Sequence, residues 1–209
     1  MASELLDPRR DEPIKAGVVA VQGDVAEHTA AIERAAETVG RSVEVSTIRG
    51  SGIVPQCDFL AMPGGESTTI SRLIHREGIA AEIIDHVSAA KPLLATCAGL
   101  IVASRDAKDD RVDPLGVVDA TVNRNAFGRQ KDSFETTLSI GSGDPFHAVF
   151  IRAPQVASIG DEVEVLARHG GNIVAIRDGS VVGTAFHPEL TPDPRVHHLA
   201  MFGSQVIIE

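Results

Sequence analysis

The sequence predicts an α/β fold, a three-layer sandwich built on a mixed, mostly parallel central sheet. In the first half, short apolar segments alternate with amphipathic helical patterns, which is the order of βαβ units in a parallel sheet. After about residue 116, β-rich segments follow one another with few helical patterns between them. Two pairs of turn residues, Gly170-Gly171 and Asp178-Gly179, are typical of antiparallel hairpins. The later strands therefore make the sheet mixed.

The first half supplies four strands and the helices between them. Asp24 is placed to cap a helix that ends near Gly40, with Val25, His28, Ile32 and Ala35 at helical spacing. Further helices are expected after the Pro-Gly-Gly turn, around residues 79–87, and directly after Cys97. The expected strands are residues 14–21, 42–48, 58–62 and 93–96.

The second half contributes antiparallel strands and a closing helix from about Pro194. Residues 1–13 are charged and interrupted by proline, so we expect a flexible tail there and a single domain over residues 14–209. The strands expected in this half are residues 117–122, 135–140, 162–167, 172–176 and 181–186.

Composition excludes several classes of protein. With 19 Lys and Arg against 29 Asp and Glu, the net charge of −10 opposes a role in binding nucleic acid. No apolar run approaches the ~20 residues that a membrane-spanning helix needs, and no secretory signal is present. Two cysteines do not make a disulfide framework, and the spacing of the eight histidines predicts no metal site. We therefore expect a cytoplasmic protein without membrane or nucleic-acid partners.

The charged residues also suggest adaptation to salt. Only four of the 19 basic residues are lysine, and acidic residues are abundant. Such a surface suits a halophilic cytoplasm. At molar salt, charges interact over only ~3 Å, so the repulsion between acidic side chains is largely screened. A genome that favours arginine codons would give a similar composition.

Cys97 is the first candidate catalytic residue. It lies between a predicted strand and a predicted helix, and Ala95, Ala98 and Gly99 are small enough to allow a tight turn. A helix N-terminus stabilises a thiolate, and free backbone N–H groups beside it can bind an oxyanion. The alternative is a buried core thiol, which is the interpretation we give to Cys57.

His187 and Glu189 follow the last predicted strand. Two residues apart in extended geometry, their side chains project to the same side, so Glu189 can orient the imidazole. A cysteine nucleophile needs such a base, and sites in open α/β sheets gather at the carboxyl ends of strands. Alone, the histidine would be interpreted as structural; with Cys97 it predicts a catalytic triad.

Residues 63–69 (PGGESTT) form the third candidate segment. Glycines directly after a strand let backbone N–H groups approach a ligand, which suits an oxyanion hole opposite the nucleophile. A simple turn before a capped helix is the alternative. The GxxxxGK[ST] pattern of a phosphate-binding loop is absent.

These motifs together resemble the class I, triad-type glutamine amidotransferases, whose fold is flavodoxin-like. More specifically, they resemble the glutaminase subunit of pyridoxal 5′-phosphate synthase. The segments that carry the resemblance are residues 22–23 (QG), 63–69 (PGGESTT), 96–101 (TCAGLI), 124–130 (RNAFGRQ), 132–135 (DSFE), 150–154 (FIRAP) and 186–190 (FHPEL).

The resemblance implies hydrolysis of L-glutamine to glutamate and ammonia by Cys97, His187 and Glu189. It further implies an oxyanion hole from Gly65 and Ala98, and a separate synthase subunit that receives the ammonia in a large hetero-oligomer. Pyridoxal phosphate would be the product of the complex and not a cofactor of this chain. The residues implied to bind glutamine are Gly65, Glu66, Ser67, Arg124, Ile151 and Arg152, and either arginine could hold its carboxylate.

Two points differ from the family or stay open. Ala95 stands where the family has glycine, two residues before the nucleophile, and fits only if its φ stays negative. The helix near residues 22–28 is a docking face by resemblance, or else Glu27 and His28 are ordinary surface and packing residues.

Residues 106–113 are expected to form a solvated loop, and His197 and His198 cannot share one helix face.

The alternatives are another triad amidotransferase, such as the type that feeds imidazole glycerol phosphate synthesis, and a protease-like cysteine hydrolase. A third is a non-catalytic regulatory module of the same fold. The DSFE and FIRAP segments argue against the first two, and the intact triad against the third.

Overall fold

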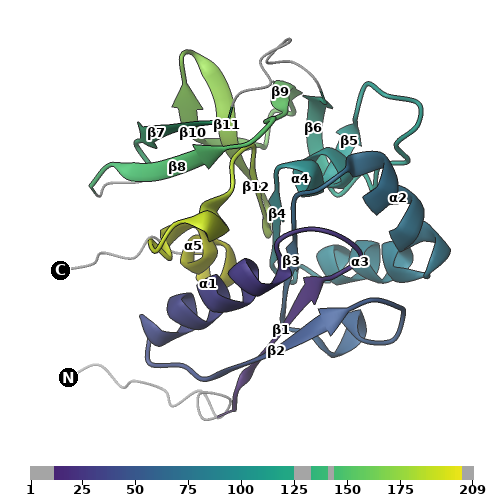
Figure 1. The fold of residues 1–209 in the computed structure, drawn as a ribbon. Coiled ribbons are helices and arrows are strands. Elements are labelled where there is room, and N and C mark those ends of the chain that lie inside the picture. The colour runs from purple at the N-terminus through teal and green to yellow at the C-terminus, as the bar shows by residue number, and fades with distance from the viewer. Residues whose placement is uncertain (1–11, 125–132, 141–143, 204–209) are drawn as a thin grey trace.

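The computed structural model describes residues 12–124, 133–140 and 144–203. A ten-stranded sheet runs through the middle of the molecule, in the order β2-β1-β3-β4-β12-β11-β9-β6-β5, with β10 paired to β11 (Figure 1). The strands from β2 to β12 in this order are parallel, and those around β11 and β9 are antiparallel. This is the mixed sheet that the sequence predicts.

The parallel part of the sheet is made of five short strands, and its inner members are buried on both faces. Four of them are the apolar segments predicted from the first half, and their ends differ from the prediction by up to two residues. The fifth, β12, comes from the second half; it was expected to be antiparallel, and it pairs antiparallel with β11 but parallel with β4. Their bounds are β1 Ile14–Val19, β2 Val43–Ile48, β3 Phe59–Met62, β4 Leu93–Thr96 and β12 Val181–Thr184.

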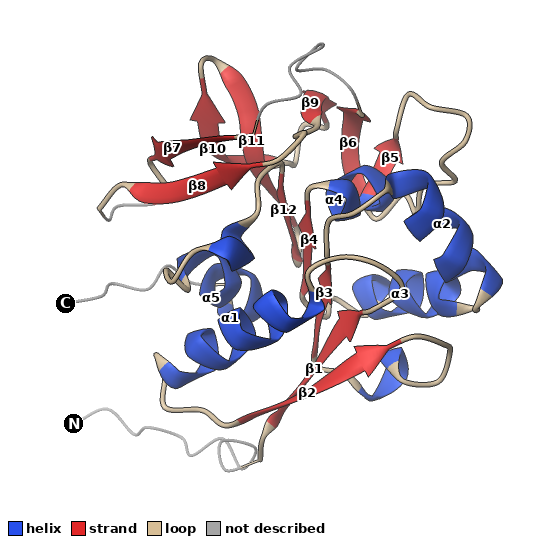
Figure 2. Cartoon of the chain, viewed as in Figure 1, coloured by secondary structure: helices blue, strands red, loops and turns tan. Residues whose placement is uncertain are grey.

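Helices cover both faces of the sheet and make the other two layers (Figure 2). Helices α1 (Val25–Glu37) and α5 (Arg195–Phe202) pack on one face, around Ile32, Phe186 and Val196. Helices α2 (Ser67–Arg76), α3 (Ile79–Ser88) and α4 (Ala98–Ala103) pack on the other, around Ile70 and Ile83. Two separate apolar clusters, one on each side, hold the three layers together.

The remaining strands lie at the other end of the sheet, apart from the pair β7–β8, which forms its own small antiparallel sheet. Gly170-Gly171 closes the β10–β11 hairpin and Gly179 turns β11 into β12, all three with positive φ, as their turn type requires. The bounds are β5 Ser104–Asp106, β6 Val118–Asn123, β7 Phe134–Leu138, β8 Phe146–Phe150, β9 Gln155–Ile159, β10 Glu164–His169 and β11 Asn172–Asp178; short 3-10 turns cover Val54–Gln56 and Pro188–Leu190.

Three sequence expectations need correction. Strands β5, β8 and β9 were not expected. Asp24 precedes α1 but makes no side-chain cap. The expected loop 106–113 begins at the end of β5, and its Asp109 is half-buried in an ion pair described below.

In the described part of the chain, no helix is both long and apolar enough to cross a membrane.

Candidate active site

The site lies where four neighbouring parallel strands end. β1, β3, β4 and β12 are adjacent in the sheet and run in the same direction, so their carboxyl ends meet at one edge. β3 leads into the Pro-Gly-Gly turn, β4 into Cys97, and β12 into the segment that holds His187. Topology alone therefore brings the predicted catalytic segments together.

Cys97 occupies a strained turn between β4 and α4. Its φ of 49° and ψ of −109° place it outside the regions that non-glycine residues commonly adopt. The Cys97 N–H donates to the Thr184 carbonyl at 2.8 Å, which ties the turn to β12, and its Sγ lies 3.7 Å from the Ile151 carbonyl oxygen. Cys97 is buried, but its strained conformation between a strand and a helix is typical of the turns that carry nucleophiles.

Small residues make room for this turn. A Cβ at Gly99 would lie 2.1 Å from the Met62 carbonyl oxygen, so only glycine fits there. Ala95 is a regular member of β4, paired with Gly183 and Met62, and is not among the residues with positive φ. The φ of Ala95 is therefore negative, as an alanine at this position requires, and the strained residue of the turn is Cys97.

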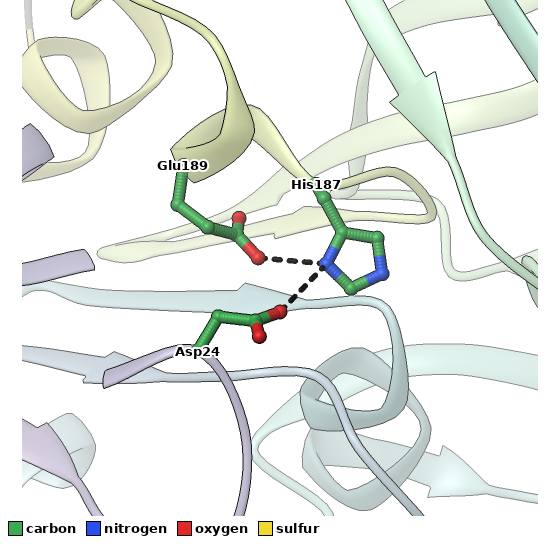
Figure 3. Close-up of side chains that lie close together, drawn as sticks. All are labelled: Asp24, His187 and Glu189. Carbon is green, nitrogen blue, oxygen red and sulfur yellow. Dashed lines mark hydrogen bonds and ion pairs between the residues drawn. The ribbon is translucent and has the colours of Figure 1, made fainter. Parts of the chain in front are cut away.

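His187 faces two carboxylates (Figure 3). Its Nδ1 is 2.7 Å from Oε1 of Glu189 and 3.7 Å from Oδ2 of Asp24. Since Nδ1 is bound to Glu189, Nε2 is the nitrogen left for Cys97. Donor atoms of these three residues lie within 4.8 Å of one another, a spacing that a metal could also use, but the 2.7 Å bond already commits Nδ1 to Glu189.

Electrostatics favour a charged imidazole in this site. Burial alone would lower the pKa of His187, but hydrogen bonds with the Cys97 and Glu189 side chains outweigh it and raise the pKa to about 10. Burial would raise the pKa of Glu189, yet the neighbouring His28 and His187 rings lower it. Asp24 is half-exposed, and its pKa is raised by burial and by the charge of Glu189. The pair His187–Glu189 is therefore ionised at neutral pH.

Behind the triad lies a buried polar network that the sequence did not predict. His28 of α1 has Nε2 3.5 Å from Oε2 of Glu189 and 3.2 Å from Oγ1 of Thr96. Its Nδ1 is 3.1 Å from Nε2 of His197, on α5. Burial lowers the pKa of both histidines to about 3, so both rings are neutral at neutral pH.

The Pro-Gly-Gly turn brings backbone close to both triad side chains. A Cβ at Gly64 would lie 2.7 Å from Cε1 of His187 and 3.2 Å from Cβ of Cys97. Gly65 has a φ of 142°, and the next N–H, that of Glu66, donates to the Gln22 side chain at 2.8 Å. The turn is thus glycine-dependent at two consecutive positions, for two different reasons.

These segments enclose a pocket of about 360 Å³, a size that suits a small ligand. Ser67 lines it with a buried hydroxyl that has no hydrogen-bond partner among the described residues. All the predicted binding and oxyanion residues lie in this pocket, with Gly23, Asp24 and Ile101 in addition. The lining residues are Gly23, Asp24, Gly65, Glu66, Ser67, Cys97, Ala98, Ile101, Arg124, Ile151, Arg152 and His187.

The two arginines of the pocket differ in their partners. Arg124 is bound by the Glu66 carboxylate and, at 3.0 Å, by Asp109. Glu66 also caps α2 by accepting from the Thr68 and Thr69 N–H groups, and it accepts from the hydroxyls of both threonines as well. The pKa of Glu66 is lowered to about 2, because the hydroxyl hydrogen bonds, the Thr69 N–H and Arg124 outweigh the effect of burial. Arg152, exposed and with a φ of 46°, pairs with no carboxylate in the described part of the chain.

Sequence reasoning missed Asp24, His28 as a partner of Glu189, His197, and Asp109 as a partner of Arg124. The helical spacing did place His28 on the buried face of its helix, and it is fully buried, so it cannot belong to a docking surface; Glu27 is exposed. Cys57 is buried, as predicted. Residues 125–132, which carry most of the RNAFGRQ segment, and the tail up to residue 11 lie outside the described residues.

Known structures share this architecture. A crystal structure of a glutamine amidotransferase matches with a TM-score of 0.79 at 41% identity, covering 90% of this chain and 99% of that one. The structure of PurLQS from Thermotoga maritima shares the fold, with a TM-score of 0.63 at 15% identity over 90% of this chain and 94% of that one. The fold is that of the class I glutamine amidotransferases.

Sequence comparison narrows this class to one family. The profile of the SNO glutamine amidotransferase family matches residues 18–206, and the chain belongs to that family. Relatives named pyridoxal 5′-phosphate synthase subunit PdxT are similar to it. One from Halorubrum lacusprofundi is 64% identical, covering 93% of this chain and all of its own. One from Haloarcula marismortui is also 64% identical, with 91% and 98% covered, and one from Methanothrix thermoacetophila is 52% identical, with 88% and 97% covered.

The contact at Gly64 can be tested by a minimal substitution. Gly64→Ala adds one methyl group against His187 and Cys97, so we expect alkylation of Cys97 by iodoacetamide to slow by about 10-fold or more, because the imidazole is displaced from the thiol. Mass spectrometry of the Cys97 peptide gives the rate. Gly50→Ala is the matched control, since a Cβ there meets no atom within 4 Å. An unchanged rate in Gly64→Ala would contradict the described geometry.

The neutral histidine pair predicts acid sensitivity. The unfolded chain protonates His28 and His197 near pH 6.5, whereas the folded chain holds them neutral down to about pH 3. The free energy of unfolding should therefore fall as the pH drops below about 6.5, by up to about 1.4 kcal/mol per pH unit for each histidine.

Urea denaturation between pH 7 and pH 4.5 measures this slope. His197→Gln should make this slope shallower by the contribution of one histidine, and Val39→Gln, at an exposed position without a titratable group, should leave the slope unaltered. Equal slopes in the wild type and His197→Gln would show that this ring does not contribute.

Proposed function

We propose that this chain is the glutaminase subunit of a pyridoxal 5′-phosphate synthase, with Cys97, His187 and Glu189 as its catalytic triad. The observation that carries the assignment of residues is the strained Cys97 turn at the end of β4, beside a hydrogen-bonded His187–Glu189 pair that follows the neighbouring strand β12. Membership of the SNO glutamine amidotransferase family supports the reaction.

The chemistry follows from the positions of these groups. The Cys97 thiolate attacks the side-chain carbonyl carbon of glutamine, and the resulting oxyanion is held by the backbone N–H groups of Gly65 and Ala98. Ala98 is the first residue of α4, so its N–H has no partner within the helix. His187 Nε2 gives its proton to the departing nitrogen, the C–N bond breaks, and ammonia leaves a glutamyl thioester on Cys97.

The second half of the reaction uses the same groups. A water molecule attacks the thioester carbonyl carbon while neutral His187 takes its proton, and the C–S bond breaks to give glutamate. The thiolate and the imidazolium are then restored. Glu189 stabilises each imidazolium state through the 2.7 Å hydrogen bond at Nδ1.

For substrate binding, we assign the α-carboxylate of glutamine to Arg152. The charge of Arg124 is already opposed by Glu66 and Asp109, whereas Arg152 lines the pocket and pairs with no carboxylate among the residues that the structure describes. Ser67, whose buried hydroxyl has no hydrogen-bond partner in the described part of the chain, gains one from the bound substrate. Gly65, Glu66 and Ile151 complete the contacts, with Arg124 holding Glu66 in place.

Replacing Arg152 tests this assignment. Arg152→Gln should raise KM for glutamine by about 10- to 100-fold with a smaller change in kcat, because a charge-assisted hydrogen bond to the substrate is lost. Arg76→Gln, which removes an exposed arginine paired with Glu77, should not change KM. If Arg152→Gln keeps the wild-type KM and Arg124→Gln raises it, the carboxylate belongs to Arg124.

The ammonia is passed to a separate synthase subunit in a large hetero-oligomer. Relatives are named as subunits of the synthase, and the exposed part of α1 around Glu27 is the surface we assign to docking. The chain itself needs no cofactor for hydrolysis, since pyridoxal phosphate is the product of the complex. Its location is cytoplasmic in this proposal, and the acidic, lysine-poor composition matches the halophilic archaeal origin of similar relatives.

The decisive experiment measures ammonia and glutamate released from glutamine, with and without the synthase subunit, from low to molar KCl. Wild type should be active with the partner, and Cys97→Ala should lose all hydrolysis while still folding and binding the partner. Cys57→Ala, at the other cysteine, should remain active, because Cys57 is packed away from the pocket.

A glutamine-analogue electrophile should label Cys97 alone. Hydrolysis by Cys97→Ala at the wild-type rate would remove this residue from the mechanism, and a wild type that neither hydrolyses glutamine nor reacts with the analogue would favour a non-catalytic module.

A further inference from the structure

Glu189 is a buried carboxylate with one oxygen satisfied and one that lacks a full hydrogen bond. Oε1 accepts from His187, whereas Oε2 has no partner within hydrogen-bond geometry among the described residues. The ring nitrogen Nε2 of His28 lies 3.5 Å from Oε2, and both side chains are 0% exposed. Bulk solvent therefore does not reach this oxygen, and the ring of His28 faces it.

The neighbours of His28 decide which of its nitrogens carries the proton. Its Nδ1 lies 3.1 Å from Nε2 of His197, so one of these two nitrogens donates and the other accepts. If His28 donated from Nδ1, its Nε2 lone pair would point at the Glu189 carboxylate. His197 would then keep an N–H at Nδ1, where no acceptor is found among the described residues. A buried donor without an acceptor costs about 1–3 kcal/mol.

The opposite arrangement satisfies more groups. His197 then donates from Nε2 to Nδ1 of His28, and His28 presents an Nε2–H to Glu189 Oε2 and to Thr96 Oγ1 at 3.2 Å. The unpartnered His197 Nδ1 becomes an acceptor only, which is the cheaper group to leave unsatisfied. The arrangement that satisfies more donors therefore points the N–H of His197 at His28 and the N–H of His28 at the carboxylate of Glu189.

We propose that His28 is a positioning residue of the glutaminase reaction: oriented by His197, it directs its Nε2–H at the second oxygen of Glu189 and fixes the carboxylate so that the first oxygen holds His187. The inference rests on the proposed function. The 3.5 Å separation shortens when substrate is bound, because catalytic hydrogen bonds tighten in the reacting complex.

The residues of this network come from different helices and strands that pack together, and this packing fixes the position of His28 relative to Glu189. His28 lies one turn into α1, His197 on α5, and Thr96 at the end of β4, directly before the nucleophile. His28 joins these three elements to Glu189, in the turn Pro188–Leu190. The charged or titratable groups that face the network are His187 and Asp24 beside Glu189, and Arg34 near His197. Because burial keeps both rings neutral, His28 supplies a dipole and no second cation.

The test compares His28→Leu with His28→Gln in the complex with the synthase subunit. Leucine removes the donor, whereas the amide of glutamine reaches the place of Nε2 and keeps it. We expect kcat for glutamine hydrolysis to fall by about 10-fold or more in His28→Leu with KM within two-fold of wild type, and His28→Gln to recover most of it. Circular dichroism and partner binding establish that each variant is folded.

A second readout does not depend on glutamine. With Glu189 less firmly held, the imidazolium of His187 is less stabilised, so the raised pKa of His187 falls, and the inflection in an NMR titration of the His187 ring moves to lower pH in His28→Leu. A purely structural defect lowers the folded fraction and leaves this inflection in place. Wild type without glutaminase activity would refute the proposed function, whereas active wild type with an unshifted inflection in His28→Leu would overturn this inference.

Equal loss of kcat in the leucine and glutamine variants would also overturn it, because packing and not the N–H would then be what matters. If His28→Leu does not fold, the pair His197→Leu and His197→Gln decides. His197→Gln keeps a donor to Nδ1 of His28 and should retain activity. His197→Leu removes that donor, so the proton of His28 is no longer fixed on Nε2, and kcat should fall. If both His197 variants are active and their inflections are unshifted, the proposed orientation of His28 by His197 is refuted.

Discussion

The pairing of β4 with β12 is the constraint on which the rest of the site depends. In this register Thr96 lies opposite Thr184, and the next N–H, that of Cys97, still donates to the Thr184 carbonyl at 2.8 Å. The nucleophile is therefore held by the sheet, although it lies beyond the end of the strand. A slip of one residue would turn every side chain of the strand to the opposite face of the sheet and separate Cys97 from His187. The buried apolar residues of both strands, packed in two clusters on opposite faces, oppose such a slip.

Backbone strain and glycine contacts follow from this pairing. A non-glycine residue at φ 49° and ψ −109° costs on the order of 1–3 kcal/mol and persists only where its surroundings over-determine it. Here Gly99 lets α4 pass against the Met62 carbonyl, and Gly64 lets the neighbouring loop approach both triad side chains. In this conformation Cys97 lines the pocket, and the two glycines leave room for the backbone to pack closely around it. Small residues thus make up the surroundings of the nucleophile because larger ones would fill the space the reaction needs.

Local patterns and long-range contacts explain what could and could not be predicted. The strand–turn–helix around Cys97 and the extended His187-x-Glu189 spacing are local, and both were predicted from the sequence. Strand β8 was missed although Phe146, Ala148 and Phe150 alternate with less buried residues; this period-two signal was available. Its Val149 carbonyl accepts from the His187 N–H at 2.9 Å, so the missed strand helps to position the base. By contrast, Asp24, His28 and Asp109 become partners of site residues only through tertiary packing, and nothing in their sequence neighbourhoods identifies those partners.

The buried polar residues behind the triad are difficult to explain by stability. Replacing a buried polar or ionic cluster with apolar side chains of similar volume is often neutral or stabilising. Yet His28, His197 and Glu189 occupy the space between α1, α5 and the sheet, with nitrogen and oxygen atoms left unsatisfied. A carboxylate that must stay ionised away from water needs donors aimed at it, and one imidazole can serve only one of its two oxygens. The second imidazole meets that need without adding a charge that would compete with His187 for Glu189. On this argument, the network lowers the stability of the core in order to keep the electrostatics of the triad fixed.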